Sequence, residues 1–237
     1  MGFLRQRHRQ AEIMDQPDLP AAQHGHALDG LARINFFSRS AGILWRPLAQ
    51  LSGELGPLRI LDVATGAGDV PVRLWRKATR AGLSWQITGF DVSPHAVEYA
   101  RRRASQAGAD VSFFRHDVLD GQPLPPCDAV ICSLFLHHLE EADAVRLMRN
   151  LARPEDPGGP SLVLINDLDR SLGGLLLARV GTRLLSASSV VHTDGPRSVE
   201  GAFTRDEARG LAERAGLAGV TLHRRWPCRW LLSWRRA

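Results

Sequence analysis

The sequence predicts an α/β protein with a doubly wound, mainly parallel sheet of seven strands. Three observations support this fold class. After residue 57, short apolar runs alternate with stretches of helical periodicity, which is the order expected when helices cover both faces of a parallel sheet. Before residue 57, apolar residues recur at helical spacing. Near the C-terminus, two strand-like runs flank a short turn. With 237 residues, 44% of them apolar, the chain can bury a core.

The first five predicted strands are short apolar runs, as buried parallel strands are. The last two surround Trp226-Pro227-Cys228 and predict an antiparallel hairpin at the sheet edge. The predicted strands are Arg59–Val63, Trp85–Phe90, Val111–Arg115, Ala129–Cys132, Ser161–Ile165, Val220–Arg224 and Arg229–Trp234.

Capping residues place three helices between or after these strands. Ser93-Pro94 starts one helix, which Gly108 ends. Glu140-Glu141 suits the start of a second helix, because acidic residues stabilise helix N-termini. Thr204 to Glu207 is a capping box for a third, which stops at Gly216. Their predicted inward residues are Val97, Ala100 and Ala104 in the first, Val145, Met148 and Leu151 in the second, and Leu211 and Ala215 in the third.

The sequence divides into an arm, a lid and one main domain. Residues 1–25 have little periodicity and predict an arm with one short helix around Arg5–Met14. Residues 26–56 predict two amphipathic helices that form a lid, and residues 57–237 the main domain. Residues 171–191 predict an apolar helical insertion, which is either a wall of a lipophilic pocket or a plain core helix. The segment from His192 to Pro196 predicts a polar loop.

The charge balance leaves several classes of partner open. The chain has 29 arginines and one lysine, Lys77, against 25 acidic residues, for a net charge of +5. Nucleic acid, an anionic membrane surface and an acidic small molecule all suit such a charge. Because the basic residues are scattered from Arg5 to Arg236, the excess also fits a use of arginine unrelated to binding. The arginines and tryptophans of residues 224–236 fit a membrane interface or base stacking, or simply the closing hairpin.

Cysteine content and hydropathy predict a cytoplasmic protein. Cys127, Cys132 and Cys228 form neither a CxxC pair nor a spacing typical of a metal site, so we expect no disulfide and no metal. The basic N-terminus is not followed by the apolar region of a signal peptide. Arg179 and Arg183 interrupt the most apolar stretch, so we expect no stable membrane insertion, although peripheral contact is possible.

The sharpest local signal is a glycine loop between a strand and a helix, at Ile60–Pro71. Gly66 and Gly68 allow a tight turn and the close approach of a ligand. A dinucleotide-binding loop would have a third glycine where this chain has Pro71, and the carboxylate of Asp69 would repel a pyrophosphate. The acidic helix start instead suits a ligand that carries an ammonium or sulfonium group.

Acidic residues follow the next two strands as well. Asp91 ends the second strand, where a carboxylate can accept hydrogen bonds from both hydroxyls of a ribose. Asp117 ends the third. Together with the glycine loop, these two positions predict a nucleoside pocket that binds no phosphate.

These motifs resemble those of the class I S-adenosylmethionine-dependent methyltransferases, a family with a Rossmann-like sheet. The glycine motif matches Leu61–Asp69, with Ala64 where many members have glycine, and its form is most similar to that of the ubiquinone and menaquinone biosynthesis group. The resemblance implies S-adenosyl-L-methionine as cofactor. It implies these cofactor-binding residues: Asp62, Ala64, Thr65, Gly66, Gly68, Asp91, Val92, Asp117, Val118 and Ser133.

A weaker resemblance concerns the acceptor. Ile165–Leu168, Val191–Pro196 and Ala202–Thr204 are similar to a bacterial subgroup found beside type III polyketide synthases. That subgroup is thought to methylate phenolic or quinone-like lipids, so the resemblance implies a small lipophilic acceptor.

Methylation of a phenol needs a base, because a phenol has a pKa near ~10 and is protonated at neutral pH. His192 is one candidate, since Asp194 could orient its ring. His137 follows the fourth strand, where ligands bind in such sheets, but it could equally serve packing. Asp167, at the end of the fifth strand, could contact the acceptor or the lid.

The sequence thus predicts methyl transfer to a small apolar acceptor, most readily to a phenolic hydroxyl. C-methylation of a quinone precursor is the main alternative. A nucleic-acid methyltransferase fits less well, because the chain lacks an Asn/Asp-Pro-Pro-Tyr/Phe segment, paired catalytic cysteines and an RNA-binding module. A non-catalytic cofactor-binding protein also remains open. Because the predicted pocket is acidic, we expect the excess arginines to lie outside it.

Overall fold

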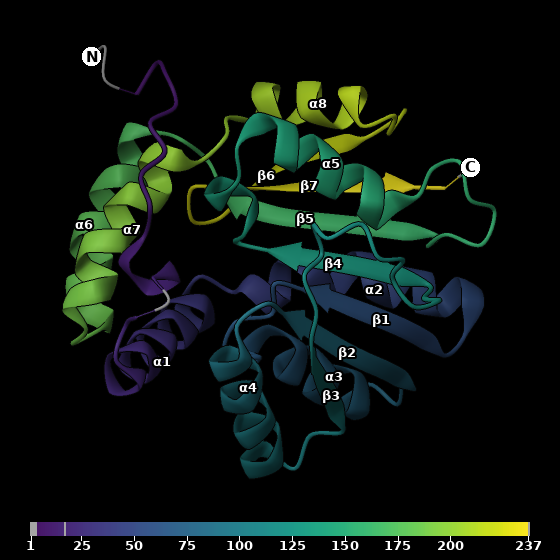
Figure 1. Cartoon of the computed structure of the whole chain (residues 1–237). Helices are drawn as coiled ribbons and strands as arrows, with labels where there is room; N and C mark the ends of the chain where they lie inside the picture. Colours follow the sequence, from purple (N-terminus) through teal and green to yellow (C-terminus); the bar gives the residue numbers. More distant parts are fainter. Residues whose placement is uncertain (1–3, 17, 237) are drawn as a thin grey trace.

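The computed structural model describes residues 4–16 and 18–236 and has the predicted fold (Figure 1). Its sheet has seven strands in the order β3-β2-β1-β4-β5-β7-β6. The first five strands are parallel, and β7 runs antiparallel to both β5 and β6, as the predicted hairpin requires. The strands are β1 (Leu58–Val63), β2 (Trp85–Asp91), β3 (Val111–Arg115), β4 (Ala129–Ser133), β5 (Leu162–Leu168), β6 (Thr221–Arg225) and β7 (Arg229–Arg235).

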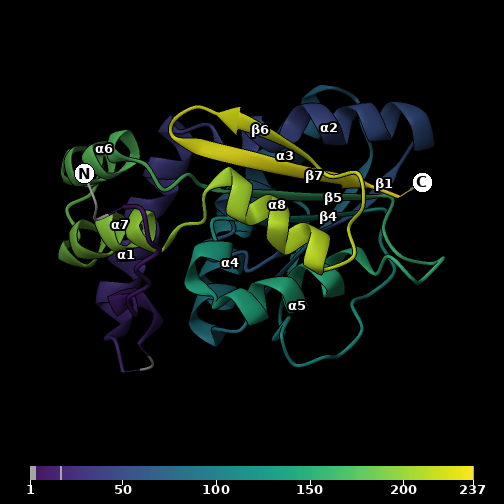
Figure 2. The ribbon, with the colours of Figure 1, turned by 90° about the horizontal axis from the view of Figure 1, so that it is seen from above.

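Helices cover both faces of the sheet (Figure 2). α2 (Ser40–Leu55) and α3 (Asp69–Arg80) pack on one face, α5 (Glu141–Ala152) and α8 (Arg205–Arg214) on the other, and α4 (Pro94–Ala107) packs against β3. The predicted caps are confirmed. The Ser93 hydroxyl accepts a hydrogen bond from the backbone N–H of Ala96, Thr204 and Glu207 form the capping box, and Gly108 ends α4 with φ +58°.

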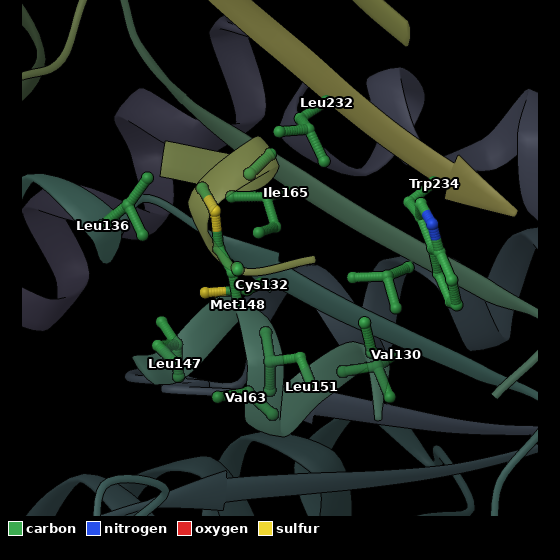
Figure 3. Packing of buried hydrophobic residues seen from close by; sticks show 14 of the residues in the cluster. Val63, Val130, Cys132, Leu136, Leu147, Met148, Leu151, Ile165, Leu232 and Trp234 are labelled. Atoms are coloured by element: carbon green, nitrogen blue, oxygen red, sulfur yellow. The ribbon is translucent and has the colours of Figure 1, made fainter. Parts of the chain in front are cut away.

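The sheet separates two apolar cores. One contains the strands, α5 and α8, and includes Leu147, Leu151, Ile165 and Trp234 (Figure 3). The other joins α2 and α3 to the opposite face of the same strands. The residues expected to face inward from the three capped helices are buried, apart from Val145, which is half-buried against the first core. Packing on both faces holds the carboxyl ends of the parallel strands as a rigid edge.

A cap lies beyond that edge (Figure 1). It consists of α1 (Ala21–Phe37), α6 (Leu172–Leu185), α7 (Ser189–Gly201) and the short turn η1 (Ile13–Asp15), which contact one another. The cap meets the sheet at the turn η2 (Leu136–His138), which follows β4. No helix in the described ranges is long and apolar enough to cross a membrane.

The arm corrects one prediction. Residues 5–12 are not helical, because their polar groups bind other parts of the chain. The Arg7 guanidinium donates hydrogen bonds to the carbonyls of His137 and Leu139, and the His8 N–H donates to the Glu200 carbonyl. The first lid helix begins at Ala21, five residues before the predicted start of the lid. Residues 1–3 and 17 of the predicted arm lie outside the described residues.

Two further expectations were wrong. α2 is not part of a lid, since its Leu44, Leu48 and Leu51 are buried in the core beneath the sheet. The segment from His192 to Pro196 is not a loop but the middle of α7. Gly195 and Pro196 ordinarily interrupt helices, and Pro196 leaves the carbonyl four residues earlier without its helical partner. Gly195 is needed there because a Cβ would stand 2.5 Å from Cγ2 of Thr182, so α7 can lie against α6.

Candidate functional site

The candidate site is a cavity of about 930 Å³ between the carboxyl ends of the strands and the cap. Its volume is near the upper end of the range for small-molecule sites, about 300–1,000 Å³. Acidic residues line the sheet side. The cap side is mainly apolar, although Glu12, Asp15 and Asp194 also line it; its apolar residues are Leu28, Leu31, Ile34, Leu177, Leu185 and Val191. The cavity therefore has a polar half and an apolar half.

The glycine loop forms the floor of the polar half. Gly66 has φ +52°, and a Cβ added there would meet no atom within 4 Å, so this position faces open space. Ala64 also adopts a positive φ, of +54°, at the end of β1. Gly68 serves a different purpose from the expected ligand approach. A Cβ at Gly68 would lie 2.7 Å from Cβ of Ala100 and 2.9 Å from the ring of Phe113, so its absence lets the loop pack on the chain itself.

Two buried carboxylates flank this loop, Asp62 in β1 and Asp69 at the start of α3. Burial raises the pKa of Asp62 to about 7, although the Thr65 hydroxyl donates a hydrogen bond of 2.5 Å to it. Burial also raises the pKa of Asp69, which receives a hydrogen bond of 3.4 Å from the Asn35 side chain. Such acids are stabilised by a cationic ligand.

Asp91 occupies the predicted place at the end of β2. Its carboxylate accepts hydrogen bonds from the backbone N–H groups of Gly66, at 2.8 Å, and Ser93, at 2.9 Å, which leaves acceptor capacity for ribose hydroxyls. Desolvation raises the pKa of Asp91 despite these bonds. Asp117 is exposed at the rim and accepts a hydrogen bond from the N–H of Leu119. All the predicted cofactor residues line the cavity except Gly68; they are Asp62, Ala64, Thr65, Gly66, Asp91, Val92, Asp117, Val118 and Ser133.

Four buried polar atoms in this lining have no hydrogen-bond partner within the described structure. They are Oδ2 of Asp69, Nε2 of His95, Nε2 of His116 and Nε of Arg229. A buried polar atom without a partner costs about 1–3 kcal/mol, so each favours a ligand with complementary groups. Together with the open space at Gly66 and the acidic floor, these atoms fit a cationic nucleoside such as S-adenosylmethionine.

His137 and Asp167 form a buried pair where η2 meets the end of β5. Nδ1 of His137 lies 2.6 Å from Oδ1 of Asp167, and the His137 N–H donates to the other carboxylate oxygen. Burial alone would raise the pKa of Asp167, but the charges and hydrogen bonds of His137 and His138 hold it below its ordinary value. Because an ionised Asp167 can only accept, Nδ1 of His137 carries the hydrogen of this bond, and Nε2 is the ring nitrogen that Asp167 does not contact. His137 lines the cavity, whereas Asp167 lies behind it.

Sequence reasoning missed the acids of the arm. Oε1 of Glu12 lies 3.7 Å from Nε2 of His137, and Asp15 lies 2.8 Å from Nδ1 of His138. No motif distinguishes these two acids in the sequence, because their role depends on where the arm crosses the cavity. Burial would lower the pKa of His138, but Asp15 and Glu12 raise it to about 9. His138 is therefore a cation at neutral pH.

Glu12, His137 and His138 also form the described group closest to a metal site, with candidate ligand atoms within 4.8 Å of one another. A protonated His138 cannot coordinate a cation, and its other ring nitrogen is held by Asp15. The geometry suits a hydrogen-bonded ionic cluster better than a metal centre. The expectation of no metal stays a prediction.

His192 lies apart from this cluster. Its Nε2 is 2.8 Å from the Ser186 carbonyl, and its side chain is not among those that line the cavity. The predicted pairing with Asp194 is wrong, because the two residues share one helix and the Asp194 carboxylate accepts hydrogen bonds from the backbone of Ile13 and Met14. Asp194 thus fastens η1 to α7.

Arg229 corrects the expectation that arginines avoid the cavity. It lines the cavity, is only 3% exposed, and donates a hydrogen bond of 2.6 Å to the Ser40 hydroxyl. Burial lowers its pKa to about 10, although Asp167 and Asp69 partly oppose this. A single buried guanidinium thus balances part of the acidic floor.

Comparison with known proteins agrees with this geometry. Residues 60–159 match a family model described as a methyltransferase domain. These residues contain the glycine loop, Asp91, Asp117 and the histidine pair that build the polar half of the cavity. This stretch of the chain is therefore similar to methyltransferase domains.

The chain is also similar to curated enzymes of two kinds. A demethylmenaquinone methyltransferase from Thermus thermophilus is 35% identical over 130 residues, which are 54% of this chain and 56% of the relative. Mouse acetylserotonin O-methyltransferase is 32% identical over 178 residues, or 72% of this chain and 42% of the relative. The chain spans about half the length of the curated relatives it matches.

Solved structures support the fold. The magnesium protoporphyrin IX methyltransferase of Synechocystis, determined with bound SAH, superposes with a TM-score of 0.58 at 17% identity, over 85% of this chain and 83% of that one. The chain therefore has the fold of that methyltransferase, with the same kind of seven-stranded sheet.

Proposed function

We propose that this protein transfers the methyl group of S-adenosylmethionine to a hydroxyl of a small lipophilic phenol. The observation that carries the proposal is the buried His137–Asp167 pair, whose histidine lines the cavity. The acidic lining suits the cofactor, and the apolar lining suits an aromatic or alkyl acceptor. A base that lines the same cavity is what a phenol requires.

Each residue of the pair has a distinct role in this proposal. Bound S-adenosylmethionine supplies an electrophilic methyl group. Nε2 of His137 accepts the proton of the phenolic hydroxyl as that oxygen becomes nucleophilic. Asp167 holds the ring by its Nδ1–H and stabilises the imidazolium that forms, as a carboxylate does behind a catalytic histidine. The apolar helices α1, α6 and α7 exclude water from the acceptor.

C-methylation of a quinone precursor is the second candidate, and the similarity to demethylmenaquinone methyltransferases favours it. The same base could remove a ring proton after carbon is methylated. The resemblance to the subgroup found beside type III polyketide synthases supports a phenolic product, and this assignment remains a prediction.

The function can be tested by mass analysis of products from a panel of alkylphenols and hydroxyquinones with labelled S-adenosylmethionine. O-methylation removes one exchangeable hydrogen from the product, whereas C-methylation keeps the hydroxyl, so deuterium exchange separates the two. Cofactor binding without any methylated product would contradict the proposal and favour a non-catalytic binding protein. Methylation of RNA or DNA would favour the nucleic-acid alternative.

The role of His137 has a matched control in this chain. We expect His137→Gln to lower kcat by about 10²–10⁴ while the affinity for S-adenosylhomocysteine changes little, because general base catalysis contributes about that factor. His192→Gln should keep nearly full activity, since His192 does not line the cavity. Equal loss in both variants, or full activity of His137→Gln, would remove His137 from the mechanism.

A further inference from the structure

α6 has two apolar sides, and only one of them is used by the cavity. Gly174, Ala178, Gly181 and Leu185 line the cavity. The opposite side presents Leu172, Leu176, Val180 and Leu184, which are 62%, 66%, 49% and 78% exposed. Their spacing of four residues makes one continuous stripe along the helix. A stripe of this size on a water-facing helix marks an interaction surface.

The β6–β7 turn extends this stripe beyond the start of α6. Cys228 of the turn packs on the first turn of the helix, where a Cβ at Gly174 would lie 3.4 Å from Cβ of Cys228. The Asp169 N–H also donates a hydrogen bond of 2.9 Å to the Cys228 carbonyl. Trp226 of the same turn is 68% exposed. A large amphipathic ring thus stands in the water in the turn that packs on the first turn of α6.

The residues around the stripe are positively charged. α6 contains Arg179 and Arg183 and has no acidic residue. Neither guanidinium forms an ion pair with a carboxylate of residues 4–16 or 18–236, and both are exposed. Arg33 of α1 adds a charge at the other end, where its Nε donates to the Leu185 carbonyl. Arg224 is exposed beside the β6–β7 turn.

We propose that this α6 surface, made of Leu172, Leu176, Val180, Leu184, Trp226, Arg33, Arg179 and Arg183, docks on an anionic lipid bilayer. Apolar side chains bordered by arginine, with an exposed tryptophan, are the composition of helices that lie in the membrane interface. A bilayer is complementary to both parts of the surface, because the leucines can be buried among acyl chains and the arginines can pair with anionic headgroups. A second copy of the chain docked by the same face would oppose arginine to arginine.

The surface also lies next to the cavity. Leu177 and Trp226 are exposed and at the same time line the cavity, so apolar side chains form part of its rim. A lipophilic acceptor dissolved in the bilayer reaches the cavity at this rim. This delivery step rests on the proposed function, whereas docking on lipid does not.

The proposal can be tested by sedimentation of the purified full chain with vesicles of phosphatidylcholine alone and of phosphatidylcholine with about one third phosphatidylglycerol. We expect binding to the anionic vesicles that weakens at high salt. The double variant Leu176→Asp, Leu184→Asp should bind at least about tenfold more weakly. The double variant Arg179→Gln, Arg183→Gln should bind anionic vesicles more weakly, by about fivefold for each arginine removed. The matched control is Leu55→Asp, which alters a leucine that is 53% exposed on α2, away from α6 (Figure 1), and should bind like the unmodified chain.

Three outcomes would overturn the docking proposal. Wild-type protein that stays in the supernatant with anionic vesicles would refute docking, as would equal binding by the aspartate variants and the control. The third outcome is a protein that forms a dimer in light scattering and fails to bind vesicles. If only the variants with aspartate on α6 were then monomeric, the surface would be assigned to contact with a second copy of the chain. Binding of S-adenosylhomocysteine by every variant verifies that each is folded. Vesicle binding without methylation of any phenol would contradict the proposed function but still support the docking surface.

Discussion

His138 predicts how the stability of this protein changes with pH. Its side chain is mostly buried. The carboxylates that face it, those of Glu12, Asp15 and Asp167, all come from other parts of the chain. Asp15 contacts its Nδ1 at 2.8 Å, Glu12 lies 3.9 Å from its Nε2, and the His137 ring lies tilted beside its ring with centroids 4.3 Å apart. Asp167 adds a further negative charge nearby. We therefore expect the protonated ring to fasten the arm over the cavity.

The size of this stabilisation follows from the pKa of His138, which is about 9 in the folded chain and ordinarily 6.5. A folded-state pKa above the unfolded value means that the stabilisation is fully present below about pH 6.5 and is lost as the pH rises through about 9. The difference corresponds to about 3 kcal/mol, of which about 2 kcal/mol is lost between about pH 7 and about pH 9.

The assay is urea unfolding of the wild type and of His138→Gln across this pH range. The wild-type free energy of unfolding should fall by about 2 kcal/mol, and that of the variant should change much less, because glutamine does not titrate. Asp15→Asn should reduce the slope by a smaller amount, since Asp15 is half-exposed and water screens its charge. Identical slopes for the wild type and His138→Gln would refute the reasoning.

Three further predictions concern packing and the cofactor. Gly68→Ala should lower the free energy of unfolding by about 2–4 kcal/mol, because the new Cβ adds close contacts to a strained φ of +68°. Gly82→Ala, with φ +69° but open space, should cost only about 1–2 kcal/mol, and an equal loss in the two variants would exclude packing as the cause. Asp91→Asn should weaken binding of S-adenosylhomocysteine by at least about tenfold in calorimetry, and unchanged affinity would remove Asp91 from the cofactor site. Trp230→Phe should cost about 1–3 kcal/mol in thermal unfolding, since the Phe203 carbonyl loses its buried hydrogen bond of 3.0 Å; an unchanged midpoint would contradict this.

Local signals in the sequence were sufficient for the cofactor half of the site. The glycine loop, Asp91 and Asp117 each follow a strand whose apolar run predicts its position, and parallel strands bring their carboxyl ends to one edge. Gly68 shows the limit of such reasoning. The sequence correctly predicted that this position requires glycine, but the reason is close packing against Ala100 and Phe113 and not the approach of a ligand.

The acceptor half was less predictable, because residues distant in the sequence build it. Glu12 and Asp15 reach the histidines from more than 120 residues away, and no spacing rule links them. Gly195 and Pro196 predicted a loop, yet packing on Thr182 outweighs the lost helical hydrogen bond and keeps α7 continuous.

The sequence by itself determined which runs are strands and which of the turns after them carry glycine and acidic residues, and hence the resemblance to methyltransferases and the cofactor predicted from it. These features depend on neighbours within a few residues, so local pattern is enough to read them. Only the tertiary structure decided that His137 rather than His192 meets the cavity, that Arg229 is buried among acids, and that α6 shows a leucine stripe to solvent. These depend on which surfaces pack together, and the hydrophobic effect that packs them is not directional.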